Sequence, residues 1–86
     1  MIKIGSFVRS NKGRDKDNIY IVKGIFERNI QLVDGNGKTI DKPKTKNIKH
    51  VVDLNEVCEK IANKFKDNQK VFDAEVYSAI KKFKAE

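Results

Sequence analysis

Several residue types are scarce in this sequence, and each shortage excludes a class of protein. The 86 residues include one cysteine, one histidine, one proline and no tryptophan. A single cysteine cannot form an intramolecular disulfide, so a reducing compartment is favoured and we expect a cytoplasmic protein. The sequence contains no pair of cysteines or histidines at the spacing of a zinc site and no glycine-rich phosphate loop with the spacing Gly-x-x-x-x-Gly-Lys-Ser/Thr. We therefore expect no metal, no nucleotide and no other cofactor.

Long hydrophobic runs are also missing. The longest apolar stretch is a few residues, whereas a membrane-spanning helix needs about 20. The first five residues lack the apolar region and the cleavage site of a signal peptide, so we expect neither secretion nor membrane insertion. Cys58 is expected on the packing face of a helix, where a thiol is inert. The sequence thus favours a protein that is not an enzyme and has no small-molecule substrate.

Acidic residues are in short supply only in the first part of the chain. Nineteen Lys and Arg oppose twelve Asp and Glu, which gives a net charge of +7. Residues 1–52 hold twelve of the cations and five of the acids, whereas residues 53–86 hold seven of each. The whole excess lies in the N-terminal part. This asymmetry indicates a polyanionic partner bound by that part, with the remainder serving stability or protein contacts.

Residues 6–52 are predicted to form short antiparallel strands. Apolar or β-branched runs at residues 7–8, 19–26 and 30–33 are separated by a polar hairpin loop and a short turn. Residues 34–37, Asp-Gly-Asn-Gly, are typical of a tight hairpin from which residues 38–40 return as a strand. Pro43 places residues 42–46 on a sheet edge or in an exposed connection, and residues 48–52 are predicted to be the last strand. Residues 1–52 are therefore predicted to be a small β-barrel.

After Val52 the apolar period changes from two to about 3.6. Asp53 with Glu56 forms a capping-box pattern, which predicts that a helix starts there. Its apolar face would consist of Val57, Cys58, Ile61, Ala62 and Phe65. Asp73 predicts a second start, followed by an apolar stripe of Val76, Tyr77, Ile80 and Phe83. Residues 53–86 are thus predicted to form an αα-hairpin, packed together or on the barrel, and the whole chain one compact unit that is mainly β with α.

Two basic clusters indicate the kind of partner. In residues 10–16, three cations and a glycine share one hairpin loop, where backbone N–H groups and positive side chains are exposed together, as phosphate binding requires. A plain solvated turn is the alternative. The second cluster comprises Lys42, Lys44, Lys46 and Lys49, spaced so that several share one face of an extended segment. Such a row is tolerated best with an anion opposite, which favours nucleic acid over a solvated surface.

Four other residues have competing interpretations. Asn47 could cap a turn or contact nucleic acid, and His50 is expected to have a structural role. Tyr20 and Phe26 are expected to pack in the core, not to stack on bases. The sequence therefore does not indicate sequence-specific readout.

Two segments resemble a known family. Gly5-x-Phe7-Val8-Arg9-Ser10-x-x-Gly13-Arg14-Asp15-Lys16, with the apolar strand through Val22, resembles the KOW motif of ribosomal and transcription-elongation proteins. Residues 42–51 are similar to the end of the KOW barrel in large-subunit ribosomal proteins of the fourteen-e type. Small bacterial KOW-domain RNA-binding proteins have the same layout of a barrel followed by a short helical tail. The resemblance covers essentially the whole chain.

The resemblance implies an SH3-like barrel that binds RNA, in particular ribosomal RNA, in the neighbourhood of ribosomal proteins. Asp15 is expected to organise the loop. Asp17 replaces the second glycine of the KOW pattern; aspartate tolerates left-handed backbone but adds a negative charge near the RNA. Double-stranded DNA binding and a KOW protein-interaction module contacting transcription or translation machinery are the alternatives. The candidate RNA contacts, including Lys42 from the lysine row, are Arg9, Ser10, Lys12, Gly13, Arg14, Lys16, Lys42, Lys44, Lys46, Asn47 and Lys49.

Overall fold

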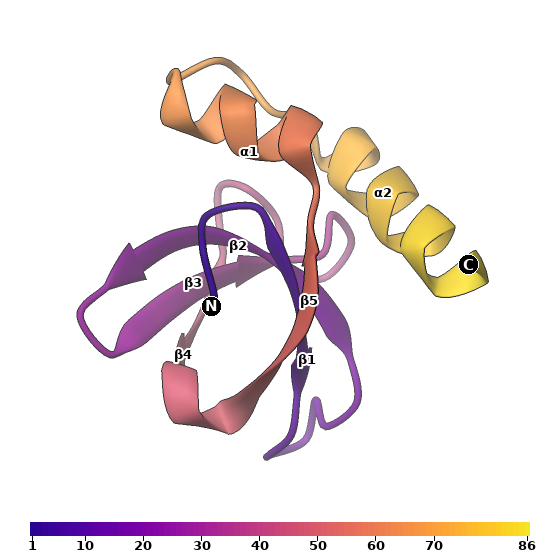
Figure 1. Ribbon diagram of the computed structural model, residues 1–86. Helices are drawn as coiled ribbons and strands as arrows, with labels where there is room; N and C mark the ends of the chain where they lie inside the picture. The colour runs from indigo at the N-terminus through magenta and orange to yellow at the C-terminus, as the bar shows by residue number, and fades with distance from the viewer.

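The computed structural model describes residues 1–86 and contains five strands followed by two α-helices (Figure 1). In chain order the elements are β1 (Ser6–Ser10), β2 (Ile19–Phe26), β3 (Asn29–Val33), β4 (Lys44–Asn47), the 3-10 helix η1 (Ile48–His50), β5 (Val51–Val57), α1 (Glu59–Lys66) and α2 (Asp73–Ala85). The prediction of a mixed architecture, mainly β with α, is confirmed.

The strands form one antiparallel sheet in the order β4-β3-β2-β1-β5. The first four strands follow one another as neighbours, and β5 returns to pair with β1. The sheet is strongly curled (Figure 1). It is not closed into a barrel, because the outer strands β4 and β5 share no backbone ladder. A side chain bridges the curl instead, because Lys46 Nζ on β4 donates a hydrogen bond to Ser10 Oγ on β1 at 2.9 Å.

Alternation along the strands creates two apolar clusters, one on each face of the sheet. The cluster inside the curl consists of Val8, Tyr20, Val22, Ile30, Leu32 and Val51. On the opposite face, Phe7, Ile21 and Val33 are covered by side chains from the helical region, namely Ile61, Val71, Val76 and Ile80. Because successive strand residues point to opposite faces, Phe7 and Val8 belong to different clusters. The predicted apolar faces of the helices are confirmed for Ile61, Ala62, Val76 and Ile80, which are buried, but Tyr77 is exposed and Val57 belongs to β5.

The predicted start of the first helix at Asp53 is wrong. Asp53 lies in β5, opposite Val8 of β1, and the strand continues to Val57. The Asp53 carboxylate does cap a turn, since its Oδ1 accepts a hydrogen bond from Asn55 N at 2.9 Å, but this turn is a left-handed irregularity within the strand. The helix begins only at Glu59. The long-range ladder with β1 outweighs the local helix-start signal, and the sheet extends beyond residue 52.

The tight turn predicted at residues 34–37 forms, since Asp34 N donates to the Lys38 carbonyl oxygen at 2.8 Å, but the prediction that residues 38–40 return as a strand is wrong. Residues 34–43 form an irregular connection, and the returning strand begins at Lys44. The connection docks on the start of α2: Ile40 N donates to Asp73 Oδ1 at 2.8 Å. Gly35 has a φ of 75°, and a Cβ there would lie 2.2 Å from the Asp73 carbonyl oxygen. Contact with the helix therefore determines the shape of this connection.

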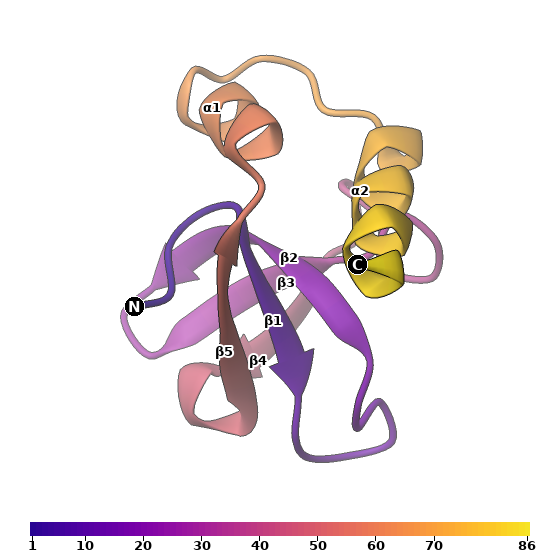
Figure 2. The ribbon, with the colours of Figure 1, turned by 45° about the vertical axis from the view of Figure 1, so that its right-hand side comes forward.

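The end of the sheet and the helical tail differ from prediction in three further ways. Residues 48–50 are the 3-10 helix η1, so the last strand begins at Val51 and not at residue 48. Asp73 is the first residue of α2 and Phe72 the residue before it, whose N–H donates to Glu75 Oε2 at 3.1 Å. The two helices lie over the same face of the sheet but do not run antiparallel along each other in either view (Figures 1 and 2). An ion pair joins them, with 2.9 Å between Lys64 Nζ and Glu75 Oε1.

Candidate nucleic-acid interface

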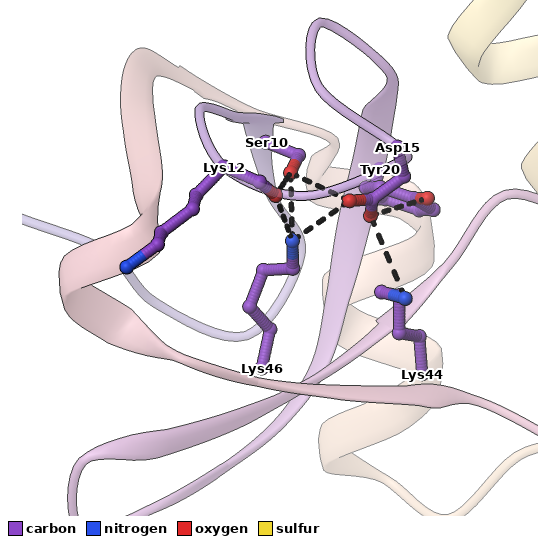
Figure 3. A network of polar contacts seen from close by, with 6 residues as sticks. All are labelled: Ser10, Lys12, Asp15, Tyr20, Lys44 and Lys46. Atoms are coloured by element: carbon purple, nitrogen blue, oxygen red, sulfur yellow. Dashed lines mark hydrogen bonds and ion pairs between the residues drawn. The ribbon is translucent and has the colours of Figure 1, made fainter.

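The loop between β1 and β2, residues 11–18, is organised around the carboxylate of Asp15. Ser10 Oγ donates to Asp15 Oδ1 at 3.0 Å, and Tyr20 OH donates to Oδ2 at 2.9 Å. Lys46 Nζ donates to Oδ1 at 2.8 Å, so the network joins the loop to three strands (Figure 3). Only 11% of the Asp15 side chain is exposed. The prediction that Asp15 organises the loop is confirmed.

The charge state of this network is fixed by its surroundings. Burial raises the pKa of Asp15, but hydrogen bonds from Lys46, Tyr20 and Ser10 and the charge of Lys44 outweigh it and lower this pKa to about 2. Burial, together with the neighbouring Asp15 carboxylate, raises the pKa of Tyr20 to about 12. At neutral pH Asp15 is therefore an anion and Tyr20 a neutral donor. The loop is therefore held by charge-assisted hydrogen bonds, and neither Asp15 nor Tyr20 changes its charge in the physiological pH range.

The predicted lysine row is divided by the structure. Lys44 and Lys46 share one face of β4, as their spacing predicts, but the anion opposite them is Asp15 of the same chain. Lys46 Nζ also donates to Ser10 Oγ and to the carbonyl oxygen of Lys12, at 2.9 and 2.7 Å, which occupies its three hydrogens. Lys44 Nζ lies 3.8 Å from Asp15 Oδ2. These two lysines therefore support the loop from within the protein.

Three loop cations face solvent instead. Lys12, Arg14 and Lys16 are exposed, and their side chains have no hydrogen bond or ion pair within the protein. Lys46 holds the Lys12 carbonyl, while the Lys12 ammonium points away from the network (Figure 3). Gly13, with a φ of 93°, provides the left-handed backbone of the turn. A rigid loop thus presents three unpaired positive charges.

The 3-10 helix η1 extends this positive surface. Asn47 Oδ1 accepts a hydrogen bond from Lys49 N at 3.0 Å, so of its two predicted roles the turn cap is the one observed. Asn11 N donates to the His50 carbonyl oxygen at 3.0 Å, which fastens the loop to η1. Partial burial, and then the charges of Lys12, Lys49 and Lys46, lower the pKa of His50. Lys12 and Lys49 consequently lie in one positive field around His50.

Sequence reasoning missed Arg28, which is exposed in the turn between β2 and β3. Its carbonyl oxygen accepts a hydrogen bond from Ile48 N at 2.7 Å, so Arg28 lies beside η1. No local motif marks this arginine; only the pairing of Asn29 with Asn47 brings the turn to η1. We call the exposed cations of the loop, of η1 and of the β2–β3 turn that contacts η1 the basic rim, which comprises Lys12, Arg14, Lys16, Arg28 and Lys49. Lys42 is exposed at the opposite end of β4, beyond Pro43.

Asp17 and Arg9 neutralise each other next to the loop. Asp17 has a φ of 75°, which confirms that the residue in place of the expected glycine takes up left-handed backbone. Its Oδ1 lies 3.1 Å from Arg9 Nη1. The Asp17 side chain is 69% exposed, so this pair is solvated. Arg9 is therefore less free to meet an anion than the cations of the basic rim.

Other kinds of functional site have little support in the arrangement of the side chains. No cluster of three or more His, Cys, Asp or Glu residues could hold a metal ion, and neither helix has the length and apolarity needed to span a bilayer. Cys58 is half-buried against the core, but it is the residue before α1 and does not lie on the helix face as predicted. A scan against protein-family models gives no match for this chain, and neither does a search of curated proteins.

Proposed function

We propose that this chain is a non-enzymatic, cytoplasmic RNA-binding protein that binds ribosomal RNA, or associates with the ribosome, through the basic rim. The observation that carries the proposal is the loop of residues 11–18, which hydrogen bonds to β1, β2 and β4 hold in place. Its internal network satisfies Asp15, Lys46 and Ser10 completely, yet leaves Lys12, Arg14 and Lys16 without any acceptor. Fixed, unpaired cations in one place repel one another, and a phosphate backbone removes that repulsion.

The lysines have two different roles, holding the loop or facing solvent, and this difference supports the same function. Lys46 and Lys44 set the position of the loop, so that its backbone does not have to be ordered when RNA binds. The rim cations then act on phosphates, and the arginines can also stack on an unpaired base. Binding of this kind is directed by charge and shape. Because Lys42 lies at the other end of β4, the rim, and not the whole lysine row, would provide the principal contacts.

For the fold, we propose an SH3-like barrel of the KOW type with an open seam. Three features support it: the strand order, the 3-10 helix between the last two strands, and the Lys46 to Ser10 bridge across the curl. In this interpretation residues 11–18 are the KOW loop. The helices cover the apolar cluster on the outer face of the sheet. Residues 1–52 without residues 53–86 would leave that cluster exposed.

The salt dependence of RNA affinity tests the proposed function. If four or five rim cations each neutralise a phosphate, log affinity falls against log salt with a slope of about −3 to −4.5. The measurement is fluorescence anisotropy with a labelled ribosomal-RNA stem-loop between about 50 and 200 mM salt, a range over which affinity falls by well over tenfold. Duplex DNA of equal length, added as a competitor, separates RNA from DNA binding. A slope near zero would contradict the proposal.

Exposed apolar residues favour a second candidate, a KOW protein-interaction module that contacts transcription or translation machinery. Phe26 is 59% exposed at the end of β2 and Ile25 is 37% exposed beside it. The prediction that Phe26 packs in the core is wrong, since its ring lies over Gly24 on the outside of the sheet. This candidate predicts that Phe26→Ser abolishes capture of a ribosomal protein or polymerase subunit while RNA affinity is unchanged.

The Asp17 carboxylate gives a prediction of its own. Replacing Asp17 by Asn keeps a residue type that tolerates left-handed backbone, removes one negative charge beside the rim and releases Arg9. We expect RNA affinity to rise about fivefold at 0.1 M salt, with a slope steeper by about 0.7 to 0.9. Asp41→Asn is the matched control, because Asp41 is also exposed but lies in the connection near α2. Equal gains in both variants would mean that only net charge matters.

A further inference from the structure

A surface hollow of about 550 Å³ lies between the end of the loop and the last turns of α2. Asn18 and Ile19 line it from the loop side, and Tyr77, Lys81 and Lys84 line it from the helix. Figure 2 shows the C-terminal end of α2 directed toward the end of the sheet that carries the loop. The hollow is therefore continuous with the surface on which residues 11–18 lie.

The aromatic ring in this hollow is accessible although its helix packs on the sheet. Tyr77 is 43% exposed, whereas the neighbouring residues Val76 and Ile80 are buried in the core. Gly35 packs against the Tyr77 backbone: a Cβ on this glycine would lie 2.7 Å from Tyr77 N. Lys81 Nζ lies 5.5 Å from the centre of the Tyr77 ring. The ring is therefore partly exposed, with the Lys81 ammonium over one of its faces.

The charges of the hollow favour an anion that carries a flat apolar group. Lys81 and Lys84 oppose one carboxylate, that of Asp34. Asp34 Oδ1 accepts hydrogen bonds from Asn36 N at 2.9 Å and Lys38 N at 2.8 Å, so it serves its own turn. Single-stranded RNA has both the negative charge and the flat apolar group, because its phosphates pair with lysines and its bases stack on aromatic rings.

We infer that Tyr77, flanked by Lys81 and Lys84, is a second RNA contact, a stacking site for an unpaired base next to the structure bound by the basic rim. The inference rests on the proposed function and gives the helical tail a part in it. The tail is neutral overall, but this corner of it is not. RNA with a single-stranded extension should therefore bind more tightly than the same stem-loop without one.

The test compares one stem-loop with and without an extension of about six nucleotides, within the span of such sites. Tyr77→Ala should weaken binding of the extended RNA about five- to tenfold and leave the plain stem-loop unaffected. Tyr77→Phe should retain the affinity, because phenylalanine also stacks. Lys84→Gln should weaken the extended RNA about fivefold. Lys82→Gln is the matched control: Lys82 is in the same final turns but borders a different hollow, with Cys58 and Lys60.

Tyrosine fluorescence gives an independent readout. The protein has two tyrosines and no tryptophan, and Tyr20 is buried in the core, so quenching by RNA reports on Tyr77. The extended RNA should quench the emission of the wild type but not that of Tyr77→Phe. Equal losses in Lys82→Gln and Lys84→Gln, or equal binding of both RNAs without quenching, would overturn this site and leave the proposed function standing. Failure of the wild type to bind either RNA would overturn both.

Discussion

Replacing Lys12, Arg14 and Lys16 together by glutamine is expected to lower RNA affinity by two to three orders of magnitude at 0.1 M salt. Each phosphate contact contributes a salt exponent of about 0.7 to 0.9, which at 0.1 M is roughly five- to eightfold in affinity. Three contacts then account for about a hundred- to five-hundredfold. The slope of log affinity against log salt should become shallower by about 2 to 2.7. Titration of the variant by anisotropy at several salt concentrations measures both quantities.

The control for this variant removes the same charge from the helices. Lys60, Lys66 and Lys82 are exposed and unpaired, and replacing them by glutamine also changes the net charge from +7 to +4. We expect less than about a threefold loss of affinity, because distant charges are largely screened at this salt concentration. Neither variant should alter stability by more than about 0.5 kcal/mol, since none of the six side chains is buried. Equal losses in the two triple variants would show that RNA does not recognise the rim.

Asp15→Asn is expected to lower the free energy of unfolding by about 2 to 3 kcal/mol at pH 7. The amide can still accept a hydrogen bond from Tyr20 or Ser10, but the ammonium of Lys46 loses its counter-ion at a site where only 11% of its side chain is exposed. Removing one partner of a largely buried pair leaves an uncompensated charge. Urea denaturation measures the loss, and the melting temperature should fall by about 10 °C or more.

The same variant has a characteristic pH dependence. The pKa of Asp15 is about 2 in the folded protein against an ordinary value of 3.8, so its ionisation stabilises the folded state above pH 4. That contribution, of about 2 kcal/mol, disappears as the pH falls through the folded pKa. The difference in stability between wild type and Asp15→Asn should therefore be constant from pH 5 to pH 7 and shrink toward pH 2. Asp41→Asn, which changes an exposed carboxylate, should show no such difference. A wild-type advantage that persisted at pH 2 would contradict this account of the loop.

Features that rest on local chemistry could be predicted from the sequence. The alternation at Phe7 and Val8 places them on opposite faces of a strand, and the loop that follows has the expected composition. Asp15 organises that loop, and Asp17 adopts left-handed backbone. In each case the residue type and its immediate neighbours are sufficient, because the interaction spans a few residues of chain.

Features decided by distant segments could not be predicted. Asp53 caps a turn through Asn55 N and not a helix through a capping box with Glu56, because the ladder between β1 and β5 keeps this segment in a strand. Likewise, the lysine spacing indicates an anion opposite β4, yet nothing in the sequence identifies it as Asp15, which lies 31 residues before Lys46. Arg28 joins the basic rim only through the contact of its turn with η1.

The bridge from β4 to β1 also affects the exposed edge of the sheet. β4 is an outer strand of four residues preceded by Pro43, and its free backbone groups are a potential template for a strand from another molecule. A strand added there would have to uncurl the sheet and withdraw Lys46 from Ser10 and Asp15. That withdrawal would leave the Asp15 carboxylate and the Lys46 ammonium, which now neutralise each other, without a counter-ion. The network that positions the loop thus makes edge-to-edge aggregation costly.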